Sequence, residues 1–193
     1  EPMATGTAVD FGGDAMRIAG DASGFGRIAG QGGTVRLIAG SSLTATGGEL
    51  IIDGRVIGNS VVDIAPGAAL RTRGDVGGQL DNAGTLESYR GNLIVSVETL
   101  TNTGLLANGP GSSLFVNALT LNHTGSITAE VGGVVGFDQP VVNVSGQSIT
   151  LNGGSVSAPQ ITNASGGTIA GMGALAADLL NQGTVDFFGN TQV

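Results

Sequence analysis

A short motif recurs along most of this chain at a nearly fixed period, and it restricts the possible folds more than any other feature of the sequence. Its clearest mark is an asparagine that returns at positions 82, 102, 122, 143, 163 and 181. Each asparagine follows an apolar residue and precedes a glycine and a second apolar residue, as in "LDNAGTL" at 80–86 and "LTNTGLL" at 100–106. Similarity at one fixed period indicates a repeat architecture. The series consists of Asn82, Asn102, Asn122, Asn143, Asn163 and Asn181.

The repeat continues upstream in a weaker form. Asp63 takes the asparagine position in "VDIAPGAAL" at 62–70, and "LTATGGEL" at 43–50 keeps only part of the motif. Further upstream the motif becomes "RIAG" at 17–20, "RIAG" at 27–30 and "LIAG" at 37–40. This spacing is half of the period, so we expect these segments to be two sides of the same coil.

Short β-branched segments between Gly, Asn and Pro residues predict strands. They are "NLIVSV" (92–97), "SLFVNALTL" (113–121), "VVGF" (134–137) and "QSITL" (147–151). Only "ALAADLL" (174–180) looks helical, and it falls within the repeat. Helical repeats need longer periods and far less glycine than the 36 residues here. We therefore predict an all-β fold, a single-stranded parallel β-helix (β-solenoid) with coils of about 20 residues.

Eight or nine coils would stack at about 4.8 Å per coil into one domain. We expect residues 17–193 to form the solenoid and residues 1–16 to form an N-terminal extension or cap strand. The apolar residues of the motif should point inward: Leu80, Leu86, Leu100, Leu106, Ile127, Ile149 and Ile169.

The asparagines have a structural explanation. Asn and Gly tolerate positive φ at a tight corner, and stacked asparagines can form an amide ladder from coil to coil. Glycosylation sequons also occur at Asn122, Asn143 and Asn163, but they coincide with these corner positions, which makes glycosylation the weaker interpretation.

Charge is scarce and unevenly distributed. The chain has 15 acidic residues and 7 basic residues, and its formal net charge is −8. This balance argues against nucleic acid or an anionic membrane as a partner. There is no cysteine, so disulfides and thiolate zinc sites are excluded. No apolar run approaches the roughly 20 residues that span a bilayer, and we expect no membrane insertion.

Five arginines recur at intervals slightly shorter than one coil: Arg17, Arg36, Arg55, Arg73 and Arg90. They predict a column of guanidinium groups on one face. Two interpretations remain open. The column is either an exposed ion-pair ladder with Asp53 and Asp75, or a strip that binds sulfated or uronic glycans.

Other candidate sites are weaker. His123 stands beside Asn122 with no nucleophile or metal cluster nearby in sequence, so we expect a solvent-facing turn residue and no catalyst. "DFGGDAM" (10–16) and "DASGFG" (21–26) resemble calcium loops in composition but not in spacing, and Gly-rich turns explain them better. We expect no catalytic residue, no metal site and no cofactor, although a polysaccharide-degrading β-helix enzyme stays an alternative.

At "LDNAGTL", "LTNTGLL" and "ITNASGGTIAGMGALAADLLNQGTV" the chain resembles the β-helical passengers of secreted bacterial adhesins, which include autotransporter and filamentous-haemagglutinin-like exoproteins. The resemblance covers about residues 43–190. It implies an extracellular or cell-surface rod, largely non-enzymatic, used for attachment or surface structure. The N-terminal secretion-domain signature and the C-terminal membrane barrel of that family are not in this sequence.

The segment "VDFFGNTQV" (185–193) has an apolar strand pattern without a polar or helical cap. A solenoid end of this kind is a template for strand addition. We therefore expect Val185, Phe187 and Phe188 to form an assembly edge, through which copies join head to tail into a filament. Extracellular glycans are the other expected partner.

Overall fold

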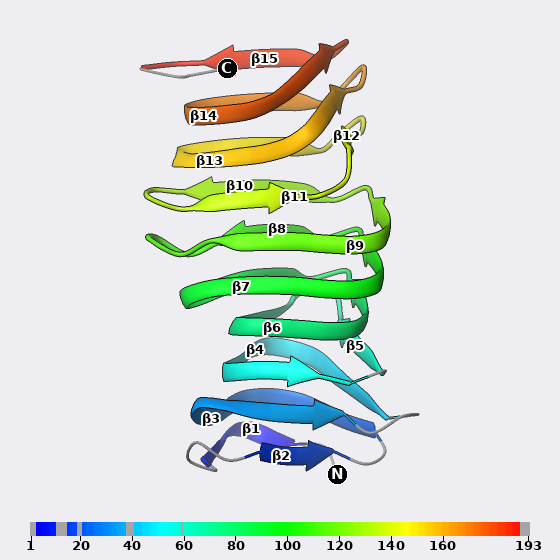
Figure 1. The fold of residues 1–193 in the computed structure, drawn as a ribbon, viewed down its shortest axis with the longest axis vertical. Helices are drawn as coiled ribbons and strands as arrows, with labels where there is room; N and C mark the ends of the chain where they lie inside the picture. The colour runs from blue at the N-terminus through cyan, green and yellow to red at the C-terminus, as the bar shows by residue number, and fades with distance from the viewer. Residues whose placement is uncertain (1–2, 11–14, 19–20, 38–40, 59, 190–193) are drawn as a thin grey trace.

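The chain folds into a rod of stacked coils, with the N-terminus at one end and the C-terminus at the other (Figure 1). The structure is a computed structural model, and it describes residues 3–10, 15–18, 21–37, 41–58 and 60–189. Within these residues there are strands and turns and no helix. The strands are β1 Met3–Asp10, β2 Ala15–Ile18, β3 Asp21–Leu37, β4 Ser42–Ile57, β5 Val61–Ile64, β6 Ala68–Asn82, β7 Thr85–Asn102, β8 Leu105–Asn108, β9 Leu114–His123, β10 Ser126–Glu130, β11 Val134–Phe137, β12 Val141–Asn143, β13 Ser148–Asn163, β14 Thr168–Asn181 and β15 Thr184–Phe187.

Every pairing between described strands is parallel, and each strand pairs with the equivalent strand of the next coil. Leu80 lies beside Leu100, for example, and Leu86 beside Leu106. The fold is therefore a β-solenoid with about 8 coils, as the repeat predicts. The helical-looking segment 174–180 is part of β14, and the four segments predicted as strands lie in β7, β9, β11 and β13.

Each coil has three faces, because the long strands bend at two corners. β13 pairs with β14 in three runs: 148–152 on the first face, 155–157 on the second and 160–163 on the third. The register shifts between these runs mark the corners. Shorter strands such as β8, β10 and β11 occupy one face each, where a turn replaces a continuous bend.

The interior is a continuous aliphatic core. Alternate residues of each strand point inward, which follows from the period-2 geometry of an extended chain. All seven residues predicted to face inward are fully buried, with 0 % exposure: Leu80, Leu86, Leu100, Leu106, Ile127, Ile149 and Ile169. The inward prediction is confirmed.

The N-terminal segments join the same stack. Ile18 of β2 pairs with Leu37 on the second face, while Ile28 pairs with Val9 of β1 on the first face. Residues 17–18 thus lie on the second face of one coil and residues 27–30 on the first face of the next, whereas Ile28 and Leu37 lie on two faces of one coil, as the half-period spacing predicts. The domain boundary expected at residue 16 falls inside β2.

Candidate functional site

The asparagine positions form an amide column at the end of the third face, in two parts, which is buried except at Asn181. In the lower part, Asn82 Nδ2 donates to Asn102 Oδ1 at 2.6 Å. In the upper part, Asn143 Nδ2 donates to Asn163 Oδ1, and Asn163 Nδ2 donates to Asn181 Oδ1, both at 2.7 Å. The predicted ladder is confirmed for these five residues.

Backbone carbonyls fix the direction of the amides. Asn82, Asn143 and Asn163 each donate a second Nδ2 hydrogen bond to a carbonyl oxygen in the coil above, at 3.0 Å. A carbonyl only accepts, so the nitrogen must be the atom facing it. Each asparagine therefore joins two coils through both a side chain and the backbone.

The ladder prediction is wrong at Asn122. This side chain is exposed, and the residue paired with Asn102 is His123. The reason is strand alternation: the residue two after the inward leucine points inward, as Asn82 follows Leu80. Asn122 directly follows Leu121 and so points outward. The ladder position can therefore be recognised in the sequence as the residue two places after the inward aliphatic residue.

The same rule corrects two further sequence assignments. Asn82 pairs with Ile64 in the coil below, so Asp63 does not occupy the ladder position. Asn143 and Asn163 are 1 % and 0 % exposed and hydrogen-bonded, so only the sequon at Asn122 has an accessible amide.

His123 is buried, at 8 % exposure, which contradicts the solvent-facing turn predicted for it. Asn102 Nδ2 lies 2.9 Å from its Nδ1. Since Asn102 also donates to the Gly104 carbonyl, its nitrogen must face the ring, and Nδ1 accepts. The neutral imidazole then carries its proton on Nε2, which is buried without a protein partner. Burial lowers the pKa of His123 to about 4.

Positive φ does not explain the asparagines, contrary to the sequence interpretation. Arg90 is the non-glycine residue with positive φ in the described part of the chain, at 56°. The corner glycines that follow the asparagines are required by close packing. A Cβ on Gly104 would lie 2.1 Å from the Gly84 carbonyl oxygen, and one on Gly125 would lie 1.9 Å from that of Gly104.

Asn108 is a corner asparagine that the repeat did not reveal. It is 1 % exposed, accepts from the Glu130 amide at 2.9 Å and donates to the Ser112 and Glu130 carbonyls. It closes the corner after β8 in the way that the ladder asparagines close the third face. It stands once in the chain, so no periodicity pointed to it.

The five predicted arginines do not form one column. Arg17 pairs with Arg36 in register, but Arg36 pairs with Ile57 and Arg55 pairs with Thr34, at a different position along the strand. The side chain of Arg17 lies outside the described residues. Arg90 lies at a corner, with its guanidinium carbon 4.9 Å from the centre of the Tyr89 ring. The arginines recur at intervals shorter than one coil, and the pairing register shifts between coils. Arg36 and Arg55, for example, therefore lie at different positions along the face.

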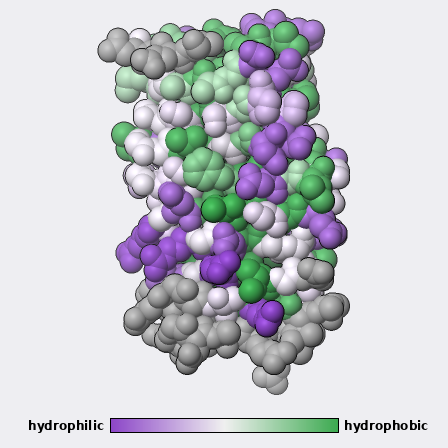
Figure 2. All heavy atoms as spheres, viewed as in Figure 1, coloured by the Kyte–Doolittle hydropathy of each residue, from purple (hydrophilic) through white to green (hydrophobic). Residues whose placement is uncertain are grey.

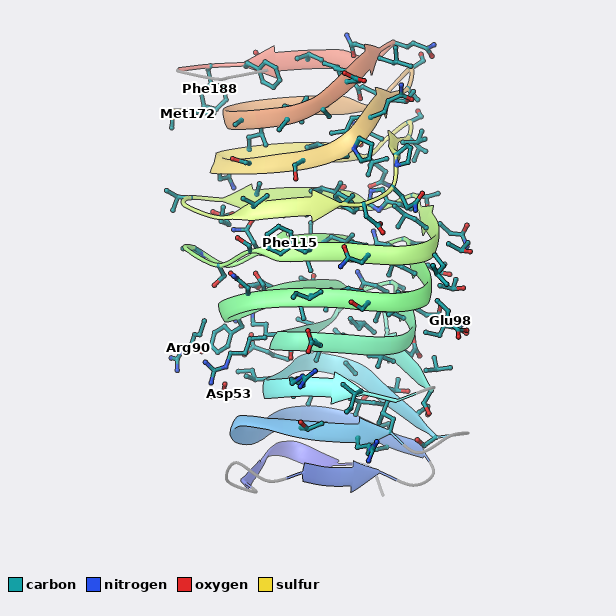
Figure 3. The ribbon with its side chains drawn as sticks, viewed as in Figure 1. Asp53, Arg90, Glu98, Phe115, Met172 and Phe188 are labelled. Atoms are coloured by element: carbon teal, nitrogen blue, oxygen red, sulfur yellow. The ribbon has the colours of Figure 1, made fainter. Side chains whose placement is uncertain are left out.

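Ion pairs join three coils on the side of the rod that carries these arginines. Arg55 pairs with Asp75 and Arg73 with Asp53, each at 2.5 Å. Arg71, which the sequence interpretation passed over, pairs with Glu49 in the coil below and with Glu87 in the coil above, the latter at 2.8 Å. Hydrophilic residues gather in this lower-left part of the surface in Figure 2, and Arg90 and Asp53 lie at the same edge in Figure 3. The ion-pair interpretation of the arginines therefore fits these contacts between coils.

The predicted assembly edge lies at the upper end of the rod. Among the described strands, β15 pairs only with Thr168–Gly171 of β14. Val185 and Phe187 therefore pack partly against the core, whereas Phe188 is 62 % exposed. Figure 3 shows Phe188 and Met172 at the same edge of this end. The sequence missed a second part of this edge. Beyond Gly171, β14 bonds to β13 on one side, and no other described strand covers it.

Metal-binding clusters and long apolar helices are both absent from the described residues. These residues contain no cluster of three or more His, Asp or Glu side chains that could hold a metal ion. They also contain no helix of the length and hydrophobicity that a membrane-crossing helix needs. Of the two segments that resemble calcium loops, 10–16 begins in β1 at Asp10, and its residues 11–14 lie outside the described part of the chain. The other segment, 21–26, belongs to β3.

Together the fold and this geometry define the class of protein as a β-solenoid repeat protein. Comparisons with protein-family models, with curated proteins and with solved structures gave no match.

Proposed function

We propose that this chain is a non-enzymatic structural rod of the bacterial cell surface or extracellular space, and that copies of it join end to end. The adhesin-like motifs, the aliphatic core that continues from Val35 to Leu175 and the hydrogen-bonded asparagine columns support this role. A stack of this kind transmits load along its axis through backbone and side-chain hydrogen bonds.

The observation that carries the assembly proposal is the open strand edge of β14. From Ala174 to Leu180 this strand bonds to β13 on one side, and among the described residues no strand lies on the other. Leu180 is 53 % exposed at this edge, at the same end of the rod as the exposed Phe188. An unpaired edge with apolar side chains accepts a further strand.

The proposed occupant is the first coil of a second copy. Among the described strands, β1 and β2 pair with β3 alone. β1 lies on the first face, as β15 does, and β2 lies on the second face, as the start of the open β14 edge does. Stacking β1 above β15 therefore preserves the order of the faces, and β2 then follows on the second face, two coils above that of β14. Such a head-to-tail contact does not close, so it gives a filament.

Electron microscopy and analytical ultracentrifugation test the assembly. We expect filaments that lengthen with protein concentration, and Leu180→Asp should abolish them because it places a charge in the new contact. Leu119→Asp is the matched control, since Leu119 is 84 % exposed on the side of the rod. Monodisperse monomers of the unaltered chain at high concentration would overturn the proposal.

Acidic-glycan binding by the arginines is the weaker proposal. Arg55, Arg71 and Arg73 already pair with carboxylates, which compete with an anionic ligand. Loss of a sulfated-glycan signal after Arg36, Arg55 and Arg73 are replaced by Gln would favour it instead. Turnover of pectin, alginate or hyaluronan by the purified protein would contradict the non-enzymatic role.

A further inference from the structure

A hollow of about 310 Å³ interrupts the side of the rod where the second face meets the third. It spans three successive coils, those of β5, β6 and β7. Figure 3 places Glu98 at this corner of β7, on the opposite edge from Asp53 and Arg90. The hollow is lined by Ser60, Val61, Gly78, Gln79, Ser96 and Glu98.

Backbone geometry creates the hollow. Gly78 has a φ of 98°, and a Cβ there would lie 2.3 Å from the Ser60 carbonyl oxygen, so only glycine fits. The Gln79 amide donates to the same carbonyl at 3.0 Å, which holds β6 close against the coil below. Gly78, Ser60 and Ser96 carry small side chains or none, so the floor of the hollow lies close to the backbone.

A register shift positions the carboxylate above this floor. Gly78 pairs with Val97 and Gln79 pairs with Thr99, so Glu98 is the extra residue of a bulge. Bulges turn a side chain away from the direction, roughly perpendicular to the sheet, that regular pairing would give it. Glu98 is exposed, and Gln79 holds its own amide toward Asp81 through a 3.0 Å hydrogen bond.

We propose that this hollow binds an uncharged, hydroxyl-rich sugar unit. The exposed Ser96 hydroxyl, a carboxamide and a carboxylate offer donors and acceptors in one small concave surface, which suits neighbouring hydroxyl groups. Val61 supplies an apolar contact for the C–H face of a ring. The volume lies at the lower end of the range of about 300–1,000 Å³ for ligand sites. Glu98 and the neighbouring Asp81 disfavour sulfated or uronic sugars, which are the ligands expected from the arginines.

This inference rests on the proposed surface role, because a sugar site serves a rod where it meets free glycans. Binding and assembly are separate measurements. Filaments without sugar binding would sink this inference alone, and sugar binding by a strictly monomeric rod would sink only the assembly proposal.

Saturation-transfer NMR and calorimetry on the full chain test the site, with glucose, galactose, mannose and N-acetylglucosamine as neutral probes and a heparin-derived disaccharide as the anionic comparison. We expect at least one neutral sugar to bind and the anionic disaccharide not to bind. Ser96→Trp should fill the hollow and weaken binding at least tenfold, and Glu98→Gln should weaken it several-fold.

Asn92→Trp is the control, since it adds the same indole at an exposed position of β7, at the opposite end of the second-face segment from the hollow. It should leave binding unchanged. Glu98→Gln changes no packed atom, so it keeps the test valid if Ser96→Trp impairs folding. Absence of binding by all four neutral sugars, preference for the anionic disaccharide, or unchanged binding in both hollow variants would overturn the proposal.

Discussion

Gly104, which follows the ladder residue Asn102, must be a glycine because the coil below leaves no room for a side chain. The Gly104 backbone approaches Gly84 so closely that a Cβ would lie 2.1 Å from a carbonyl oxygen. We expect Gly104→Ala to destabilise the rod by about 1–3 kcal/mol, as overpacking does. Gly47→Ala is the control, because a Cβ there meets nothing within 4 Å. Urea denaturation measures both, and equal stabilities for the two variants would contradict the packing explanation.

His123 gives the rod a specific pH dependence. Its pKa is about 4 in the folded chain and 6.5 in the unfolded chain. The unfolded state therefore binds the proton more readily, and stability falls as the pH drops from 6.5 toward 4. The loss approaches roughly 3 kcal/mol, at about 1.4 kcal/mol per pKa unit.

The replacement His123→Asn isolates this effect. An asparagine can accept from Asn102 and removes the titrating group, so the variant should lose less stability between pH 6.5 and 4 than the unaltered chain. Chemical denaturation at a series of pH values measures the difference. Parallel pH profiles would show that His123 does not titrate as its burial requires.

Single residues also mark the limit of what the sequence predicted. Five of the six asparagines predicted from the period occupy the ladder, because the inward aliphatic residue and the ladder asparagine keep a two-residue spacing in those coils. It misplaced Asn122, where the correct partner is a histidine of different chemistry. The hollow at Gly78 was not predicted, since it depends on a bulge at Glu98 that only the pairing register reveals.

At the scale of elements, the weakest joint of the rod lies between β9 and β12 on the third face. β9 pairs with β7 through His123, and β12 pairs with β13 through Asn143. Within residues 105–189, all of which the structure describes, no pairing joins β9 to β12. His123 Nε2 and Asn143 Oδ1, one on each of these strands, are both buried without a protein partner. The two parts of the asparagine column end here.

This joint predicts a local difference in hydrogen exchange. β12 is bonded on one side, whereas β11 of the same coil is bonded to both β9 and β13. Amides of Val141–Asn143 should therefore exchange faster than those of Val134–Phe137, because their opening breaks fewer interactions. Peptide-resolved exchange with mass spectrometry tests this, and equal protection of the two strands would contradict it.

Element positions were predictable from periodicity, but their lengths were not. β-branched runs marked the cores of β7, β9, β11 and β13. β7 nevertheless spans 18 residues, because its chain stays hydrogen-bonded around two corners. The local sequence indicates which residues of a strand are buried. Whether the strand continues around a corner depends on its hydrogen bonds to the neighbouring coil.

For the whole molecule, stability should depend on how many neighbours a coil has. Each coil contacts only the coils above and below, so its stability is close to a sum of nearest-neighbour terms. Leu106 lies in the middle of the stack and is fully buried, whereas Leu179 is partly buried in the third-face segment of β14 that no described strand covers.

Leucine-to-alanine substitutions at these two positions test that dependence. Leu106→Ala should cost about 2–5 kcal/mol, the usual cost of a cavity in a packed core. Leu179→Ala should cost clearly less, because no described strand packs on the upper side of its segment. Denaturant titrations of both variants, at concentrations where the chain is monomeric, measure the difference. A loss at Leu179 as large as that at Leu106 would mean that the rod unfolds as one unit and that its ends are as tightly held as its centre.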